Sequence, residues 1–427
     1  MIKQLIHNNR SLLKSIRDKG FYHLVSANFL IRFLGFSSQI LVAWIITPED
    51  IGRIKVMQSF MSVFVVLAGF GFNISILKLC SEDRSIEEKN YLFRKGVCYS
   101  ILPQLLTFLI ILFCIYNNML SSDSLINSVF IIYSLGIFPL ALDSSILSYL
   151  QSLKMIKEYS TVQIITKPIG VILLILLTYY FSLYGYATAI VISYVLTLVV
   201  VLIRNKALIF SKLNSVPNPF KLHMNYSFYS MLTNVIGMIL ISIDIFILNF
   251  FSVDRLELGY YSFATIFIGM LGIITRTVLQ ITHPHFSEKS NNFVKWISSF
   301  NKYNRLMNYT LISIFCLSLI FVTIFMTYIL NGKYYNSIYY FIVLAFAWLI
   351  RDSSAFRGSA LFGLGKIRVN FMINLVSLLF HALLIVLFIQ CFGIHGVPFA
   401  MILGGLVTYV LSFSVFNRIV AKEEAKL

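Results

Sequence analysis

Two consecutive apolar stretches decide the fold: YSFYSMLTNVIGMILISIDIFILNFF at residues 226–251 and LGYYSFATIFIGMLGIITRTVLQI at residues 258–281. Each is long enough to cross a lipid bilayer as one helix, which takes about 20 residues. The first stretch carries one carboxylate, Asp244, and the second carries one guanidinium, Arg276. A charge inside an apolar membrane segment is costly and by default marks a functional site. The two stretches therefore predict membrane-spanning helices built around a charged site.

The composition of the whole chain indicates an integral membrane protein. Of 427 residues, 58% are hydrophobic and only 12% are charged, whereas a soluble domain has about 25% charged residues. Apolar runs recur along the entire chain and predict an all-α polytopic fold with about twelve transmembrane helices. The predicted spans are 21–46, 54–79, 97–117, 124–150, 160–182, 184–204, 226–251, 258–282, 309–330, 335–362, 366–391 and 393–418.

The basic residues predict the orientation of these helices. The net charge is +17, and most of the 34 Lys and Arg lie in the loops on the N-terminal side of the membrane. Cytoplasmic loops are enriched in Lys and Arg, so both termini are expected in the cytoplasm. Residues 1–20 are expected to lie on that membrane surface. The positive charge is thus explained by membrane topology and lipid contact, and no nucleic-acid partner is predicted.

The sequence contains an internal repeat with a spacing of about 210 residues. Asp50-Ile51-Gly52 returns as Glu257-Leu258-Gly259, and Asp143-Ser144-Ser145 returns as Asp352-Ser353-Ser354. Six helices per repeat is an even number, so both halves enter the membrane in the same orientation. We therefore predict two six-helix lobes, residues 1–204 and 226–427, related as parallel repeats around a central cavity. Residues 205–225 form the cytoplasmic linker.

Polar residues follow helical spacing along the predicted first, second and eighth helices. Such a stripe is either a helix-packing seam or the lining of a cavity. In the eighth helix the stripe ends with Arg276, which favours the cavity. The predicted polar lining consists of Asn28, Gln39, Asn73, Thr265 and Gln280.

Away from their ends, the predicted spans also contain more cations than anions. The cations are Arg32, Lys167, Arg276, Arg351 and Arg357, and the anions are Asp143, Asp244 and Asp352. The planar fork of arginine binds phosphate through two oxygens at once, so the surplus predicts an anionic, phosphate-bearing cargo. Some of these charges have a second reading: Arg357 as a cytoplasmic helix cap, and Asp143 as a neutralising partner of Lys167. Asp244 is consistent with a partner for arginine, a proton or sodium carrier, or a gate.

Motifs for catalysis and for tightly bound cofactors are missing from the sequence. It has no Walker A loop, dinucleotide fingerprint or zinc spacing. The five cysteines are scattered, which argues against a disulfide framework or a metal site. His283-Pro284-His285 is read as a polar helix end. We therefore predict a transporter that is not an enzyme and binds no cofactor apart from a coupling proton or sodium ion.

The chain resembles the polysaccharide (O-antigen type) flippases of the multidrug/oligosaccharidyl-lipid/polysaccharide exporter superfamily. The resemblance rests on short motifs in their order and spacing: Asn28-Phe29-Leu30 through Arg32, Gly35 and Gln39; Pro48-Glu49-Asp50-Ile51-Gly52; Gly69-Phe70-Gly71; Asp244; Leu258-Gly259-Tyr260-Tyr261; His283-Pro284; and Gly365-Lys366. It implies a cavity lined by the first, second, seventh and eighth helices. It also implies transfer of undecaprenyl-diphosphate-linked oligosaccharide from the inner to the outer leaflet of the bacterial inner membrane, with polymerase and chain-length proteins as partners.

Two other functions remain open at this point. A cation-coupled drug exporter of the same superfamily would share the fold, but cationic drugs favour a cavity rich in carboxylates. A membrane polysaccharide polymerase would need a large hydrophilic loop, and no predicted outer loop is long enough. The surplus of arginine favours the flippase.

Overall fold

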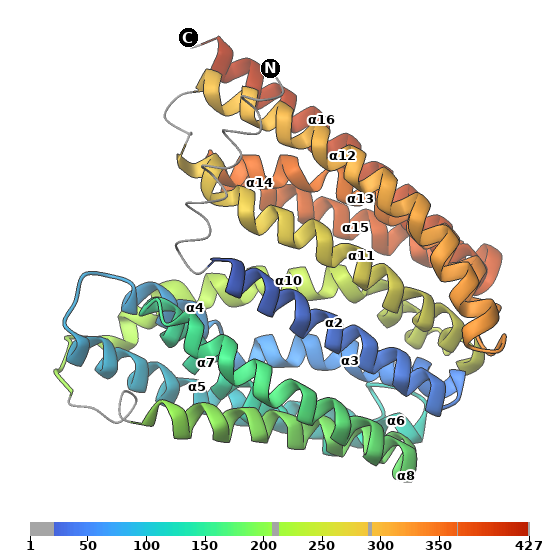
Figure 1. The fold of residues 1–427 in the computed structure, drawn as a ribbon, viewed down its shortest axis with the longest axis horizontal. Helices are drawn as coiled ribbons and strands as arrows, with labels where there is room; N and C mark the ends of the chain where they lie inside the picture. The colour runs from blue at the N-terminus through green and yellow to red at the C-terminus, as the bar shows by residue number, and fades with distance from the viewer. Residues whose placement is uncertain (1–20, 207–212, 289–292, 365, 426–427) are drawn as a thin grey trace. The chain divides into compact units, whose positions relative to one another are not determined.

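The computed structural model describes residues 21–206, 213–288, 293–364 and 366–425. Within these ranges every regular element is a helix (Figure 1). This confirms the predicted all-α fold.

The helices make twelve apolar passes within the described ranges, as predicted. Several passes are broken, and α8 contains two of them, because Ser182 has a non-helical backbone (φ 48°, ψ −128°). The two halves of α8 lie side by side, since Thr197 Oγ1 donates to Thr166 Oγ1 over 3.2 Å. The passes are α2 (Phe21–Ile45), α3 (Pro48–Gly69) with α4 (Phe72–Cys80), α5 (Ile86–Tyr116), α6 (Ser124–Ser134) with α7 (Ile137–Ser152), α8 (Ile156–Arg204) twice, α10 (Pro219–Phe250), α11 (Arg255–Glu288), α12 (Phe293–Ile324) with the π-helical turn η1 (Phe325–Ile329), α13 (Ser337–Ser353) with α14 (Ala355–Gly363), α15 (Ile367–Phe392), and α16 (Val397–Glu424), which follows the 3₁₀ turn η2 (Gly393–Gly396).

Several helices begin earlier than the apolar runs that predicted them. α5 starts at Ile86 because Ser85 and Glu88 form a capping box, in which each side chain binds the other's backbone N–H. α10 starts at Pro219, and proline is favoured in the first helical turn. These helices therefore continue as polar turns beyond the apolar segment, and hydropathy does not detect such turns.

One prediction at the start of α3 is wrong. The predicted span starts at residue 54, but the residues from Pro48 onward already form the helix. Thr47 Oγ1 accepts the Asp50 N–H over 3.3 Å, Pro48 opens the helix, and Arg53 binds Asp50 over 2.8 Å. Helix-capping contacts thus place Lys55 two turns inside α3, whereas the predicted span had it at its start.

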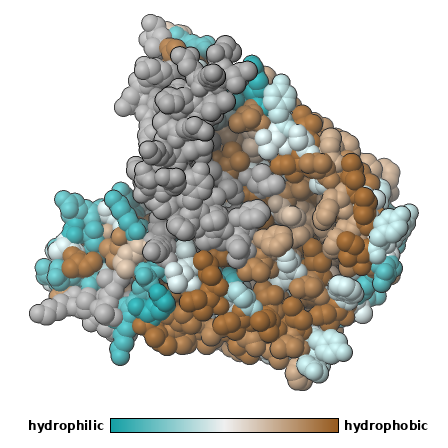
Figure 2. Space-filling model, viewed as in Figure 1, coloured by the Kyte–Doolittle hydropathy of each residue, from teal (hydrophilic) through white to brown (hydrophobic). Residues whose placement is uncertain are grey.

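Large apolar side chains cover the outside of the helices. α5 exposes six within three turns, and α8, α12 and α15 expose similar sets. Figure 2 shows hydrophobic residues over much of the visible surface, with hydrophilic residues gathered at its edges. A soluble protein rarely exposes apolar patches of this extent, whereas lipid covers them in a membrane protein. The α5 residues are Leu102, Leu105, Leu106, Leu109, Ile110 and Phe113.

The described chain forms two compact units, and two helices pass from one unit to the other. The first unit takes in the described residues up to Ile45 together with Phe60–Val235. The second takes in Ile46–Ser59 together with the described residues from Ile236 onward. The first half of α3 therefore packs with the second unit, and the first half of α10 packs with the first unit. The division into lobes at residues 205–225 remains a prediction from the repeat.

The first half of α10 is fixed in the first unit by a buried histidine. The His223 ring is fully buried; its Nδ1 lies 2.7 Å from Ser75 Oγ and its Nε2 lies 3.0 Å from the carbonyl oxygen of Leu92. Gly71 allows the close approach of α10, because a Cβ there would lie 2.3 Å from the Ser227 carbonyl oxygen. Its φ of +71° is also one that favours glycine.

Candidate functional site

Asp244 lies in the interior of the second unit and accepts two hydrogen bonds. Its side chain is 5% exposed. The Tyr261 hydroxyl donates to Oδ2 over 2.6 Å, and the Ile245 N–H donates to Oδ1 over 2.9 Å. Tyr261 comes from α11, so the carboxylate on α10 is positioned by the next helix of the chain. A hydrogen bond from a hydroxyl to an ionised carboxylate stabilises the charge at this depth.

Lys55 is the positive charge that acts on Asp244. It comes from the first half of α3, which packs in the same unit. Sequence reasoning did not select this residue, because Lys55 stands at the very start of the predicted span 54–79. A counterion inside the unit offsets much of the cost of placing a carboxylate in a membrane segment.

His381 on α15 is the third titratable group near this charge pair. Its side chain is 4% exposed, its Nδ1 lies 2.8 Å from the Ser377 carbonyl oxygen, and both Asp244 and Arg351 act on it electrostatically. The bare backbone of Gly404 makes room for the ring, because a Cβ there would lie 2.6 Å from it. Sequence reasoning did not select His381, since a single histidine in an apolar helix gives no spacing signal. The second unit thus carries a buried polar cluster made of Asp244, Tyr261, Lys55 and His381.

Arg276 and Thr265 lie on α11, as predicted. Arg276 is exposed, and one of its guanidinium nitrogens would lie 3.3 Å from a Cβ at Gly272. The side chain thus lies along the α11 surface over Gly272. Thr265 is half-buried and donates to the Ser262 carbonyl oxygen over 2.7 Å. Of the predicted polar stripe on this helix, Gln280 has a side chain outside the described residues, as do Asn28 and Arg32 on α2.

Arg351 and Arg357 have different environments. Arg351 is exposed, and its Nε donates to Asp352 Oδ1 over 3.2 Å. Arg357 is 6% exposed; its Nη2 donates to the Tyr409 hydroxyl over 3.2 Å, and its guanidinium carbon lies 4.5 Å from the Tyr409 ring centre. Arg357 is therefore packed against α16, and its Nη1 is buried without a hydrogen-bond partner among the described residues.

The first unit holds the other predicted pair. Asp143 on α7 and Lys167 on α8 act on each other electrostatically, in line with the neutralising role considered above. Asp143 Oδ1 nevertheless accepts no hydrogen bond from the described residues. Gln39 on α2 and Asn73 on α4 are half-buried in the same unit. None of these positions forms part of a cluster of three or more metal-ligating side chains in the described chain.

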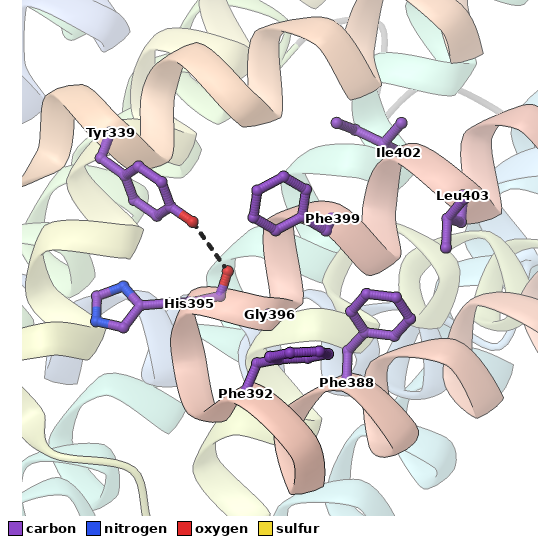
Figure 3. A pocket seen from close by; sticks show the side chains of 8 residues that line it. All are labelled: Tyr339, Phe388, Phe392, His395, Gly396, Phe399, Ile402 and Leu403. Atoms are coloured by element: carbon purple, nitrogen blue, oxygen red, sulfur yellow. Dashed lines mark hydrogen bonds between the residues drawn. The ribbon is translucent and has the colours of Figure 1, made fainter.

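An aromatic pocket, which the sequence did not predict, opens where α15 turns into α16. It has a volume of about 550 Å³ and is lined by apolar side chains together with Tyr339 and His395. Figure 3 shows the Tyr339 hydroxyl donating to the His395 carbonyl oxygen over 3.2 Å, while the His395 ring points away from the phenylalanines. The apolar lining consists of Phe388, Phe392, Phe399, Ile402 and Leu403, with Gly396. By the predicted topology this is the outer end of the unit.

A polar pocket of about 670 Å³ lies beside the aromatic one and shares Tyr339 and His395 with it. The Tyr340 hydroxyl donates to Glu257 Oε2 over 2.6 Å and lies 3.2 Å from His395 Nδ1. The Tyr340 and His395 rings are stacked, with 5.6 Å between their centres. Nearby, burial lowers the pKa of Lys333 while Glu49 opposes the shift, and the Lys333 ammonium donates to the Ile46 carbonyl oxygen.

Comparisons with known proteins agree with the fold and with the type of protein. The chain is similar to an inward-facing multidrug resistance transporter of the MATE family, with a TM-score of 0.76, 14% identity and coverage of 92% of this chain and 96% of that one. It is equally similar to the lipid II flippase MurJ, with a TM-score of 0.76, 16% identity and coverage of 92% and 87%. These neighbours are transporters rather than enzymes, as predicted for this chain.

A curated relative and a family model complete the comparison. An uncharacterized membrane protein of Methanocaldococcus jannaschii is 22% identical, over 93% of this chain and 83% of the relative. A model described as "Polysaccharide biosynthesis protein" matches residues 18–290. This match spans more than half of the sequence and includes Asp244, Lys55 and Arg276. The chain is a multi-pass membrane protein with the fold of the exporter superfamily, and it belongs to the polysaccharide biosynthesis protein family.

Proposed function

We propose that the protein flips undecaprenyl-diphosphate-linked oligosaccharide from the inner to the outer leaflet of the bacterial inner membrane, for O-antigen or another surface polysaccharide. The observation that carries this proposal is the exposed side chain of Arg276 within the predicted membrane span of α11, in a member of the polysaccharide biosynthesis protein family. An arginine inside a membrane segment destabilises the protein unless it binds the substrate or pairs with an opposite charge, so its presence there indicates one of these roles. A diphosphate is a ligand that a guanidinium binds through two oxygens.

The proposed mechanism is alternating access between the two leaflets. On the second unit Arg276 binds the diphosphate and Arg351 assists. Arg32 and Lys167 are the predicted phosphate-binding cations of the first unit. The glycan occupies the cavity while the prenyl chain stays in lipid, so the protein shields only the polar part of the substrate from the hydrocarbon. Arg357 contributes less in this scheme, because its guanidinium is already packed against Tyr409.

The buried polar cluster of the second unit is the proposed coupling element. Protonation of Asp244, or sodium binding beside it, removes the attraction between its carboxylate and Lys55, and so changes how α3, α10 and α11 pack. One elementary charge moving through 100 mV supplies about 2.3 kcal/mol, which is enough to bias such a change. Asp143 beside Lys167 is the corresponding candidate in the first unit. The partners of this activity would be the lipid-linked substrate, membrane lipid, and the polymerase and chain-length proteins that use the product.

The test is a deletion strain in which the leaflet distribution of lipid-linked repeat units is measured. We expect repeat units to accumulate on the cytoplasmic leaflet and the wild-type gene to clear them. We expect Arg276→Ala to reduce clearance at least tenfold, because it removes a charge-assisted contact worth about 1.5–3 kcal/mol. Arg204→Ala is the matched control, because Arg204 forms an exposed ion pair with Glu158 (3.1 Å), and such pairs contribute little.

Two outcomes would reject the flippase. Repeat units that reach the outer leaflet in the deletion strain but stay unpolymerised would point to a polymerase. Normal distribution of repeat units, combined with greater drug sensitivity of the strain, would point to a drug exporter. Equal clearance by the Arg276→Ala and Arg204→Ala variants would reject the cationic site alone.

A further inference from the structure

We propose that the two adjoining pockets at the α15–α16 end of the second unit form one binding site for a lipid-linked saccharide, with the sugar in the polar pocket and the lipid chain in the aromatic pocket. This inference rests on the proposed function and adds a second substrate site to it. The pockets share Tyr339 and His395, so a single amphiphilic molecule can occupy both.

The polar pocket has the groups that recognise sugar hydroxyls. Within the described residues, Glu257 Oε1, His395 Nε2 and the Asn336 side-chain amide make no hydrogen bond, so each is available to a ligand. Tyr335 and Tyr339 present exposed rings, at 63% and 39%, against which a sugar ring can pack. A site whose polar groups are fixed in place binds ligands that satisfy those hydrogen bonds much more tightly than ligands that leave them unpaired.

The same pocket is unsuited to phosphate. Its lining residues include no lysine or arginine, and the Glu257 carboxylate repels an anion. The saccharide is therefore the part of the molecule that this pocket selects. The diphosphate that joins sugar to chain is held without a cation from these lining residues, as the phosphate of a phospholipid would be, so the sugar decides which lipid binds.

The aromatic pocket suits the lipid chain. Phe388, Phe392 and Phe399 surround a space of about 550 Å³ whose polar boundary is formed by Tyr339 and His395 (Figure 3). Phe392 and Phe399 are 65% and 44% exposed, so the pocket is open at its side. A chain entering from the surrounding lipid would bury these apolar rings without a polar group being desolvated.

The paired pockets differ from the arginine site in charge, and a transport cycle needs one site that binds the substrate and another that releases it. The arginine site attracts the diphosphate, whereas the polar pocket holds the sugar without a cation. A substrate passes from a charged site to a neutral or acidic one with a weaker hold on its phosphates, and this favours release. We therefore assign the paired pockets to the product side of the cycle.

The experiment is photocrosslinking in cells that make the lipid-linked repeat unit. A benzophenone amino acid replaces Tyr335, which lines the polar pocket, or Tyr328, which is 75% exposed and lines neither pocket. Adducts are released and identified by mass spectrometry as saccharide-bearing isoprenoid lipid or as phospholipid. We expect the saccharide-bearing lipid at position 335, and at least a tenfold lower yield of it at position 328. Ile338 provides a second probe position in the polar pocket if the first variant does not accumulate.

Two substitutions separate the parts of the site. Glu257→Gln keeps an acceptor for Tyr340 but weakens the contact with sugar hydroxyls, and is expected to reduce the saccharide adduct about tenfold. Phe392→Ala is expected to reduce it severalfold, whereas Phe321→Ala, an equally exposed phenylalanine on α12, should leave it unchanged.

The proposal is overturned if position 335 captures only phospholipid, if positions 335 and 328 capture the saccharide lipid equally, or if neither pocket substitution changes the yield. The leaflet assay is scored in the same cells. If repeat units are flipped normally but no saccharide adduct forms, the paired-pocket site is rejected and the flippase function stands. If repeat units are distributed normally in cells that lack the protein, the flippase function itself is rejected.

Discussion

A Lys55→Met variant is expected to unfold far more readily than the wild-type protein. The substitution leaves Asp244, which is 5% exposed, with only the Tyr261 hydroxyl and one backbone N–H. Breaking a direct buried ion pair typically costs about 3–5 kcal/mol, because the remaining charge is uncompensated. Lys55 attracts Asp244 without a direct ion pair between them in the described chain, so we expect a smaller loss of about 2 kcal/mol, measured as the free energy of unfolding of the purified protein in detergent.

The effect should be asymmetric between the two partners. Asp244→Asn leaves Lys55, which is only half-buried, whereas Lys55→Met leaves a carboxylate that is 5% exposed, so the cost of Asp244→Asn should be about 1 kcal/mol. The double variant Lys55→Met/Asp244→Asn should be more stable than Lys55→Met alone. Additive losses in the double-mutant cycle would show that the two charges do not interact. Transport by Asp244→Asn that still responds to collapse of the ion gradient would exclude Asp244 as the coupling group.

The fold was predictable from the sequence because a bilayer requires long apolar helices. Twelve runs of hydropathy correspond to twelve passes in the described ranges, and even the hairpin within α8 was expected, since residues 160–182 and 184–204 were read as separate spans. The starts of α3, α5 and α10 were not predicted correctly, because they depend on capping contacts and on polar turns. Thr47, Pro48 and the acidic first turn of α3 contained that information in the sequence.

The site was harder to predict because it depends on contacts between distant segments. Asp244 was selected, but its neighbours Lys55, Tyr261 and His381 come from α3, α11 and α15. Helical spacing shows which residues share a face of one helix, and it cannot show which helix that face meets. The two outer pockets went unnoticed for the same reason, as their lining combines residues from α11, α13, α15 and α16.

A Gly259→Ala variant is expected to disrupt the packing of α3 against α11. The Cβ of an alanine at this position would lie 1.9 Å from the Pro48 carbonyl oxygen, an atom of the backbone that cannot rotate away. Overpacking usually costs about 1–3 kcal/mol and more where backbone must move, so we expect a loss of at least about 3 kcal/mol in the free energy of unfolding. Close helix contact through small residues is how membrane helices associate when the hydrophobic effect does not drive them together.

Two other glycines make this a graded test. Gly52→Ala places its Cβ 3.0 Å from the Gly259 nitrogen and should cost about 1–2 kcal/mol. Gly269→Ala, on the same helix as Gly259, meets nothing within 4 Å and should gain about 0.5–1 kcal/mol, because alanine is the better helix former. Equal changes in the free energy of unfolding for Gly259→Ala and Gly269→Ala would show that helix propensity, and not close helix packing, determines the effect of both substitutions. The predicted order also bears on the internal repeat, since Gly52 and Gly259 are the matching residues of Asp50-Ile51-Gly52 and Glu257-Leu258-Gly259. A Cβ at Gly52 would lie 3.0 Å from the Gly259 nitrogen, so a glycine at both positions is what the close approach of α3 to α11 requires.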